Sequence, residues 1–147
     1  MIVVDTNLVS ELMRPSPSPV VVGWVRQSEH DLYTTSITLA EIRYGIERLT
    51  GGHRKQLLRS TADEVFADFE ERVLPFDAEA AVAYATIVSD RDRAGLPIDG
   101  FDAQIASICR THRASLATRN SKDFQDTGID VIDPWQPDPH VPTDPDL

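Results

Sequence analysis

The sequence predicts a three-layer α/β sandwich, in which helices cover both faces of a mainly parallel sheet. Short apolar runs that resemble strands alternate along the chain with longer segments of helical periodicity. The first run, residues 2–4, is continuously apolar, which is typical of a strand buried on both faces. The length of 147 residues suits one domain with a sizeable core.

The predicted elements follow in chain order. The first strand ends at Asp5, and a short helix follows it until prolines interrupt the helical pattern at positions 15, 17 and 19. Glycine or proline marks several of the later boundaries, as at Gly51-Gly52, Pro75 and Gly95. The remaining helices are expected around residues 21–25, 37–49, 53–72, 78–94 and 101–112, and the remaining strands at 32–35, 115–118 and 130–132.

The charge of the chain is unevenly distributed. The formal net charge is -10, from 14 Lys and Arg against 24 Asp and Glu, which argues against a uniformly basic nucleic-acid-binding surface. Residues 43–59 nevertheless hold five basic residues and one acid, whereas residues 63–79 hold seven acids and one arginine. The last fifteen residues carry four Asp and no Lys or Arg.

The ends of the chain and its cysteine content define the expected organisation. We expect a folded domain over residues 1–135 and a Pro/Asp-rich tail over residues 136–147, whose composition cannot bury apolar surface. The apolar runs are too short to span a membrane, and no signal-peptide pattern is present. The single Cys109 excludes an intrachain disulfide. A cytoplasmic protein without membrane attachment is therefore expected.

Three acidic residues occur where predicted strands end or helices begin. Asp5 follows the first strand, and Glu41 and Asp102 lie near the starts of two helices. Ligands of open α/β sheets bind beyond the carboxyl ends of the strands, so these acids can meet in one pocket.

Such a pocket predicts a bound metal ion. Clustered carboxylates repel one another and raise each other's pKa unless a cation neutralises them. Carboxylate oxygens favour Mg²⁺ or Mn²⁺, whereas the four widely spaced histidines and Cys109 form no zinc pattern. The matching chemistry is hydrolysis of a phosphodiester by a metal-held water.

Each acid also has a purely structural interpretation. Asp5 could simply cap the helix that follows it. The sequence Thr38-Leu-Ala-Glu41 fits a capping box, in which the glutamate satisfies a backbone donor. Asp102 suits the positive end of a helix, and Asp99 is a natural N-cap of the same helix. The case for function rests on the occurrence of the acids together.

The assembled pattern resembles the PIN-domain ribonucleases, specifically the VapC/FitB-type toxins of bacterial type II toxin–antitoxin pairs. Five blocks carry this resemblance in order and spacing, and they span nearly the whole chain before the tail. The blocks are Ile2-Val-Val-Asp-Thr-Asn-Leu-Val-Ser-Glu11, Thr38-Leu-Ala-Glu-Ile-Arg-Tyr-Gly45, Phe101-Asp-Ala-Gln-Ile-Ala106, Leu116-Ala-Thr-Arg-Asn-Ser-Lys-Asp-Phe124 and Asp133-Pro-Trp135.

The resemblance implies a PIN-like fold, a homodimer, inhibition by a small cognate antitoxin, and endoribonuclease activity that depends on Mg²⁺ or Mn²⁺. The implied catalytic and metal-binding acids are Asp5, Glu41 and Asp102. Many relatives have a fourth acid where this chain has Asn120, so additional ligands could come from Asn120, Asp123 or Asp99. Thr6 and Thr118 would support the carboxylates, and the candidate contacts to RNA phosphates are Arg43, Arg48 and Arg119.

Two other functions remain open from the sequence. A non-catalytic PIN module could bind RNA or a protein while its acids serve only as helix caps. A phosphohydrolase of another α/β family could act on small phosphate esters, although Asp5-Thr6-Asn7 lacks the second acid of an Asp-x-Asp nucleophile motif.

Overall fold

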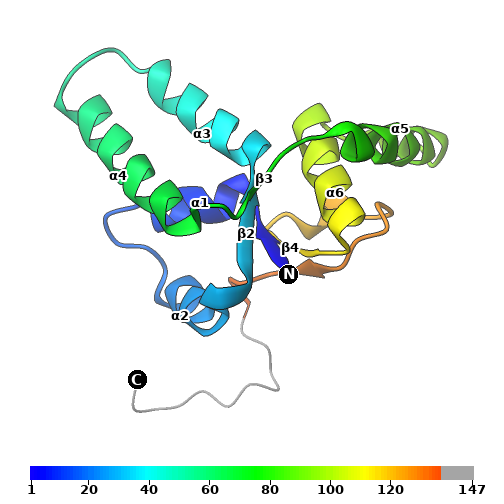
Figure 1. Ribbon diagram of the computed structural model, residues 1–147, viewed down its shortest axis with the longest axis horizontal. Helices are drawn as coiled ribbons and strands as arrows, with labels where there is room; N and C mark the ends of the chain where they lie inside the picture. The colour runs from blue at the N-terminus through cyan, green and yellow to red at the C-terminus, as the bar shows by residue number, and fades with distance from the viewer. Residues whose placement is uncertain (137–147) are drawn as a thin grey trace.

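The computed structural model describes residues 1–136 and contains one five-stranded, all-parallel sheet. The strand order is β3-β2-β1-β4-β5, so the first strand lies at the centre (Figure 1). This arrangement confirms the predicted α/β class. The strands are β1 (Ile2–Val4), β2 (Leu32–Thr35), β3 (Val73–Leu74), β4 (Ser115–Ala117) and β5 (Val131–Ile132).

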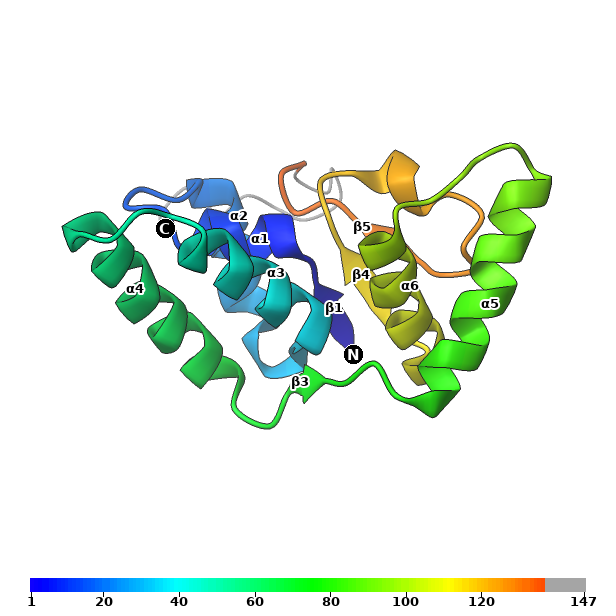
Figure 2. The same ribbon diagram turned by 90° about the horizontal axis from the view of Figure 1, so that it is seen from above.

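Helices cover the sheet on both sides. Figure 2 shows α5 and α6 together beyond β4, and the first four helices on the opposite side of the sheet. The helices are α1 (Thr6–Leu12), α2 (Pro19–Ser28), α3 (Ser36–Glu47), α4 (His53–Phe69), α5 (Ala78–Arg93) and α6 (Gly100–His112), with short 3-10 helices η1 (Glu29–Asp31) and η2 (Ser121–Phe124).

The two faces of the sheet carry separate apolar cores. Successive residues of a strand point to opposite faces, so Val3 joins the core beneath α5 and α6, while Val4 joins the core beneath α1 to α4. Leu116 and Ala117 of β4 divide in the same way. All four side chains are fully buried. Burial on both faces explains why these strands read as continuous apolar runs.

The prediction for residues 53–72 was wrong at its end. Helix α4 stops at Phe69, Glu70 has a positive φ of 47°, and β3 begins at Val73. Strand β3 pairs with β2 through bonds such as that from the Thr34 N–H to the Arg72 carbonyl, at 3.0 Å. A two-residue strand cannot be recognised from periodicity, because its apolar residues continue the helical pattern.

Two predictions concern the limits of the folded chain. Apart from Gln136, the predicted tail over residues 136–147 lies outside the described residues. Within the described part, the closing residue Trp135 packs against the core beneath α1 to α4. No helix of residues 1–136 is both long and apolar enough to cross a membrane.

Candidate active site

A small cavity of about 120 Å³ lies at the carboxyl edge of the sheet and brings the three predicted acids together. Strands β2 and β4 flank the central β1 on opposite sides, so chain connections diverge at this edge, where open α/β sheets bind ligands. The residues lining the cavity are Asp5, Thr6, Asn7, Glu41, Asp102, Ile105, Asn120 and Phe124.

Asp5 is held by hydrogen bonds to both of its carboxylate oxygens. Oδ1 accepts the backbone N–H of Leu8 at 2.9 Å, so Asp5 caps α1, as one of the two interpretations predicted. Oδ2 accepts the buried hydroxyl of Thr118 at 2.5 Å. Burial raises the pKa of Asp5, and these two hydrogen bonds oppose the increase. Asp5 therefore serves as a helix cap and also lines the cavity.

Glu41 faces the same cavity from α3, but it is not part of a capping box. The helix begins one turn earlier than the capping box requires, with Thr35 as its N-cap, and the Thr35 hydroxyl accepts the N–H of Thr38 at 3.1 Å. Glu41 Oε1 instead accepts the hydroxyl of Thr6, at 2.9 Å. The capping-box interpretation is therefore wrong, because Thr35 already satisfies the first turn.

Burial and like charge raise the pKa of two of the acids. Burial raises the pKa of Glu41, the charge of Asp99 adds to the increase, and the Thr6 hydrogen bond opposes it. Burial likewise raises the pKa of Asp102 to about 6, with further contributions from nearby carboxylates, of which Asp99 and Asp123 are the largest. These carboxylates are close enough to repel one another, which favours binding of a cation.

Asp99 and Asp102 have different roles at the start of α6. Asp99 Oδ1 accepts the N–H groups of Phe101 at 2.9 Å and Asp102 at 3.4 Å, so Asp99 is the N-cap, as expected. The carboxylate of Asp102 is not needed for capping, and it lines the cavity.

Asn120 is the only one of the three possible additional ligands that lines the cavity within the described chain. Asp99 and Asp123 lie outside the lining but close enough to raise the pKa of Asp102. An amide oxygen can bind a cation but adds no negative charge. The position at which many members of the similar family have a fourth acid is therefore occupied by the uncharged Asn120 in this cavity.

The donor set fits a hard divalent cation that keeps part of its water shell. The cavity presents carboxylate and amide oxygens, which Mg²⁺ and Mn²⁺ prefer. Within residues 1–136, however, no three His, Cys, Asp or Glu side chains are near enough to hold one ion as a group. Mg²⁺ commonly binds through one or two carboxylates and retains several waters, so a compact protein cage is not required.

Comparison with known proteins identifies the family. The sequence pattern of the PIN domain family matches residues 2–129, which is most of the chain. The chain belongs to the PIN-domain family. It is 36% identical over 139 residues to "VapC ribonuclease Y4jK" of Sinorhizobium fredii, covering 93% of this chain and 99% of that protein. It is also 36% identical over 137 residues to "Toxin FitB" of Neisseria gonorrhoeae, covering 92% and 99%.

Solved structures also resemble this PIN domain. The chain aligns with a structure described as "Structure of FitAB bound to IR36 DNA fragment" with a TM-score of 0.88 and 35% sequence identity. That alignment covers 96% of this chain and 100% of the other. The protein is thus a PIN domain of the VapC/FitB toxin type, and the predicted resemblance is confirmed.

The sequence did not single out several residues of the PIN-domain site. Phe124 and Ile105 form an apolar part of the wall, and Phe124 is the one large apolar residue between positions 119 and 128, a signal that could have identified it. The Thr38 hydroxyl lies 3.3 Å from that of Thr6 and 3.4 Å from that of Thr35, which places three threonines in a row behind Glu41. No local pattern indicates this row, because it joins two helices.

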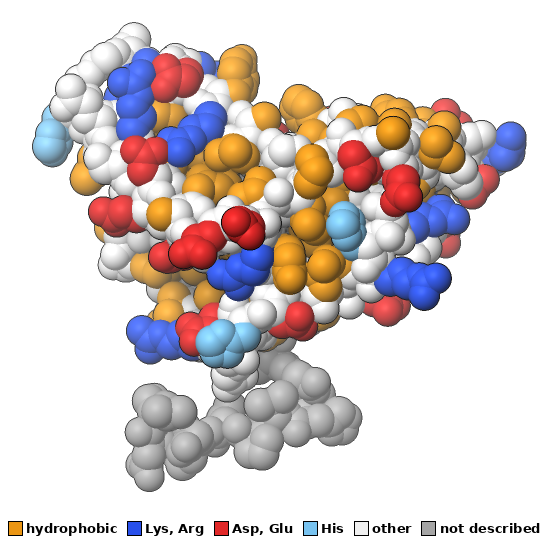
Figure 3. All heavy atoms as spheres, viewed as in Figure 1, with side chains coloured by type: hydrophobic (Ala, Val, Ile, Leu, Met, Phe, Trp, Pro, Cys, Tyr) orange, Lys and Arg blue, Asp and Glu red, His pale blue; other side chains and the backbone are white. Residues whose placement is uncertain are grey.

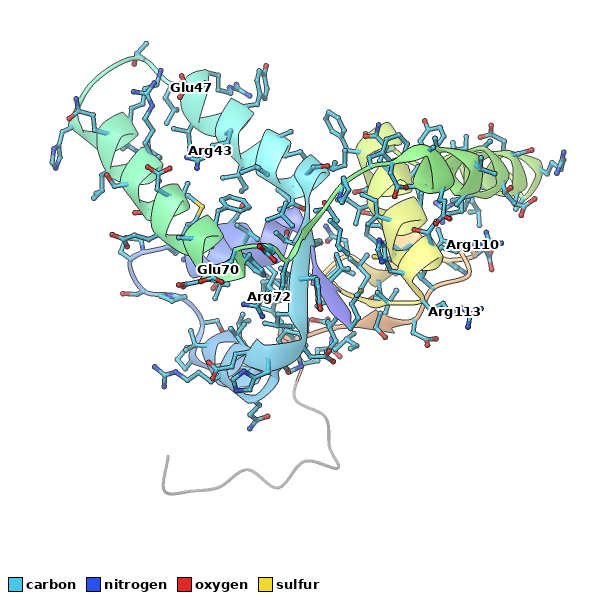
Figure 4. All side chains as sticks on the ribbon, viewed as in Figure 1. Arg43, Glu47, Glu70, Arg72, Arg110 and Arg113 are labelled. Atoms are coloured by element: carbon cyan, nitrogen blue, oxygen red, sulfur yellow. The ribbon has the colours of Figure 1, made fainter. Side chains whose placement is uncertain are left out.

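The basic segment of the PIN domain is largely engaged in ion pairs. Arg43 lies between α3 and α4 (Figure 4), 2.7 Å from a carboxylate oxygen of Asp63. Arg59 binds both carboxylate oxygens of Glu47, each at 2.9 Å. Of the other predicted RNA contacts, the Arg119 guanidinium stacks over Trp135, and Arg48 is exposed at the end of α3. Of the five basic residues in positions 43–59, Arg43, Lys55 and Arg59 therefore take part in ion pairs, and Arg48 and Arg54 form none with the described residues.

Proposed function

We propose that this protein is a Mg²⁺-dependent endoribonuclease that acts as the toxin of a type II toxin–antitoxin pair. The observation that carries the proposal is the convergence of Asp5, Glu41 and Asp102, from three distant segments, on one cavity at the carboxyl edge of the sheet. The names of its relatives, which include VapC ribonucleases and a tRNA(fMet)-specific endonuclease, support RNA as the substrate class.

Asp5, Asp102 and Glu41 would hold the ion, either directly or through its retained water molecules, with Asn120 as a further oxygen donor. When bound, Mg²⁺ or Mn²⁺ would lower the pKa of a water molecule and offset negative charge on the phosphate. Each carboxylate oxygen has a second lone pair, so the hydrogen bonds of Asp5 to Thr118 and Leu8 leave capacity for a cation.

Glu41 would orient the attacking water or accept its proton. The Thr6 hydroxyl fixes Oε1, and the raised pKa of Glu41 makes its carboxylate a stronger base than an exposed glutamate. Thr118 holds Asp5 in one orientation. Arg48 and Arg119, both exposed, would contact RNA phosphates, and the small cavity suits an unpaired strand better than an intact A-form helix.

RNA cleavage with isosteric variants tests the proposal. Asp5→Asn keeps an oxygen that can cap α1, and Glu41→Gln leaves the Thr35 cap of α3 intact, so both variants should fold. We expect wild-type protein to cut RNA with Mg²⁺ and not with EDTA, and both variants to lose cleavage. Asp92→Asn, an exposed acid on α5, is the matched control and should cleave normally.

The outcomes also separate the two rival functions. Wild-type rates in both variants would show that the acids are only structural. RNA binding without Mg²⁺-dependent cleavage would favour a non-catalytic PIN module. Turnover of a generic phosphate ester without RNA cleavage would favour a phosphohydrolase for small substrates.

A groove between α1, α2 and α4 supports an antitoxin partner. It measures about 740 Å³ and has an apolar floor that includes Leu12, Val25 and Phe69. Its rim is acidic, because Glu29, Asp68 and Glu70 outnumber Arg72 there. Glu70 lies just past the end of α4, with Arg72 beside it (Figure 4). We propose that an apolar and basic segment of a small antitoxin binds here, and that another basic stretch of the antitoxin enters the acidic cavity.

Structures of relatives described as FitAB and VapBC complexes support the search for such a partner. Co-expression with the product of the adjacent reading frame should yield a complex whose affinity falls as salt rises. Failure of that product to bind and to inhibit cleavage would contradict the antitoxin proposal.

Exposed apolar side chains support the proposal of a homodimer. Figure 3 shows apolar side chains gathered across the middle of one face, where α3, α5 and α6 approach one another. The large exposed apolar residues on these helices are Tyr44, Val82 and Phe101, at 68%, 73% and 52% exposure. Exposed patches of this kind mark association surfaces. Light scattering of the purified protein should give twice the chain mass, and Val82→Glu should reduce it.

A further inference from the structure

Arg91 is a buried arginine in a position where the pattern of α5 predicts an apolar residue. It lies on the same side of the helix as Ala80 and Ile87, and only 5% of its surface is exposed. Its neighbour Arg93, two residues later, has 76% of its side chain exposed. Burial of a guanidinium costs several kcal/mol unless its hydrogen bonds compensate, so packing alone does not account for an arginine here.

The guanidinium of Arg91 bonds two segments of backbone that are distant in sequence. Nε donates to the Leu96 carbonyl at 2.6 Å, and Nη1 donates to the Gln125 carbonyl at 2.5 Å. No Asp or Glu of residues 1–136 lies within ion-pair distance of Arg91. The charge therefore acts on carbonyl oxygens, in bonds that are stronger than those of a neutral donor.

These two segments lead directly to the wall of the acidic cavity. Leu96 precedes the N-cap Asp99 and the cavity residue Asp102. Gln125 follows η2 and the cavity residue Phe124, whose carbonyl accepts the buried hydroxyl of Thr127 at 2.5 Å. Helix α6 packs against η2. Arg91 thus connects the approach to Asp102 with the far end of the segment that carries Asn120.

We propose that Arg91 is a positioning residue that fixes the separation between Asp102 and the Asn120–Phe124 wall, and so sets the affinity of the cavity for a divalent cation. The inference about affinity rests on the proposed function, because it assumes that this cavity binds the ion. The inference about position does not, because it concerns the two loops themselves. The two parts can be tested separately.

Amide hydrogen exchange without metal tests the position. In Arg91→Met, we expect exchange to accelerate about ten-fold or more in residues 96–102 and 121–126 together, with no change in α3, because both loops lose one shared tie. Arg93→Met removes an exposed arginine from the same helix turn and should match the wild type. Unchanged exchange in either loop, or equal acceleration throughout the chain, would overturn the inference.

Binding of Mn²⁺ alone, measured by electron paramagnetic resonance, tests the affinity. Loss of a residue that orients metal ligands typically weakens binding about 10–100-fold. We expect such a loss in Arg91→Met, a smaller loss in Arg91→Lys, which keeps the charge and can keep one hydrogen bond, and none in Arg93→Met.

The outcomes distinguish this inference from the proposed function. Absence of Mn²⁺ binding by the wild type would contradict the proposed metal site, while hydrogen exchange would still decide whether Arg91 ties the loops. Binding by the wild type with the same affinity in folded Arg91→Met would overturn the positioning role. If Arg91→Met does not fold, Arg91→Lys decides in its place, and failure of both to fold would assign Arg91 to global stability instead.

Discussion

The two sides of the acidic cavity hold their carboxylates in different ways. On the threonine side, formed by Asp5 and Glu41, side-chain hydroxyls of Thr118 and Thr6 bind the acids directly. On the α6 side, formed by Asp102 and Asn120, the Asp102 carboxylate accepts no hydrogen bond from residues 1–136. Its pKa is raised to about 6, chiefly by burial.

This difference indicates which part of the cavity the fold has left for a ligand. The hydrogen bonds on the threonine side compensate part of the cost of burying its charges. The α6 side has no such compensation, and Asp102 also faces the charges of Asp99 and Asp123. A divalent cation would supply the missing compensation. The α6 side is therefore where function and stability should conflict most strongly.

The largest expected effect is the loss of activity in Asp102→Asn. Mutation of a residue that only orients metal ligands typically lowers metal affinity or activity about 10–100-fold. Removal of a proposed ligand should therefore lower Mg²⁺-dependent RNA cleavage by more than about 100-fold. Cleavage rates at saturating Mg²⁺ would measure this. Asp92→Asn is the control for the same chemical change at an exposed position. Near-normal cleavage by Asp102→Asn would show that Asp102 is not a ligand of the catalytic ion.

The same substitution should stabilise the metal-free protein at neutral pH. The pKa of Asp102 is about 6 in the folded state against a reference of 3.8, so the folded state binds its proton more tightly. The stabilisation from protonated Asp102 is complete below pH 3.8 and is lost as pH rises through 6. Because solvent screens the charge of this half-buried carboxylate, we expect the loss to reach only about 1–2 kcal/mol.

Chemical unfolding of both proteins between pH 4 and 7 in EDTA would measure this effect. The free energy of unfolding of Asp102→Asn, relative to wild type, should rise across this range. A difference that stays constant with pH would contradict the raised pKa of Asp102 and the uncompensated burial of its charge.

Metal addition should reverse that order of stability. A ligand that binds only the folded state at 100 times its dissociation constant stabilises the protein by about 2.7 kcal/mol. We expect Mn²⁺ to stabilise the wild type by this order and to leave Asp102→Asn nearly unchanged, in thermal unfolding with and without EDTA. Ca²⁺ at matched ionic strength tests the preference for the smaller ions. Equal stabilisation of both proteins would place the ion elsewhere.

On the threonine side, Thr118→Val should destabilise the protein. The fully buried Thr118 hydroxyl donates to Asp5 and accepts the Asn120 N–H at 3.1 Å, so its loss leaves buried groups without partners. We expect the free energy of unfolding to fall by about 1–3 kcal/mol. Thr61→Val, on the outer helix α4, is the control. A gain in stability would show that the Thr118 hydroxyl does not compensate the burial of Asp5.

The smallest effect is expected for Thr6→Val. Thr6 is only half-buried, so loss of its hydrogen bond to Glu41 should cost about 0.5–1.5 kcal/mol. The pKa of Glu41 should rise, because that hydrogen bond opposes the effect of burial. The pH profile of cleavage would then shift upward, and Thr6→Ser should restore it. An unchanged profile in Thr6→Val would show that Thr6 does not act through Glu41.

Much of the fold could be predicted from local patterns. The continuous apolar run of residues 2–4 indicates a strand buried on both faces, and Val3 and Val4 indeed divide between the two cores. Prolines and glycines marked several element boundaries, as at Gly95 after α5. Strand β3 was missed because two apolar residues after an amphipathic helix do not form a recognisable period.

The sequence by itself determined the order of the elements other than β3, the positions of Asp5 and Asp102 at element ends, and the family. Only the tertiary structure decided how those acids are held. The hydrogen bond from Thr118 to Asp5 joins residues 113 positions apart, and that from Thr6 to Glu41 joins residues 35 apart. The link of Arg91 to Gln125 spans 34 positions. Periodicity and turn residues report local backbone geometry, whereas these contacts depend on which elements the sheet places side by side.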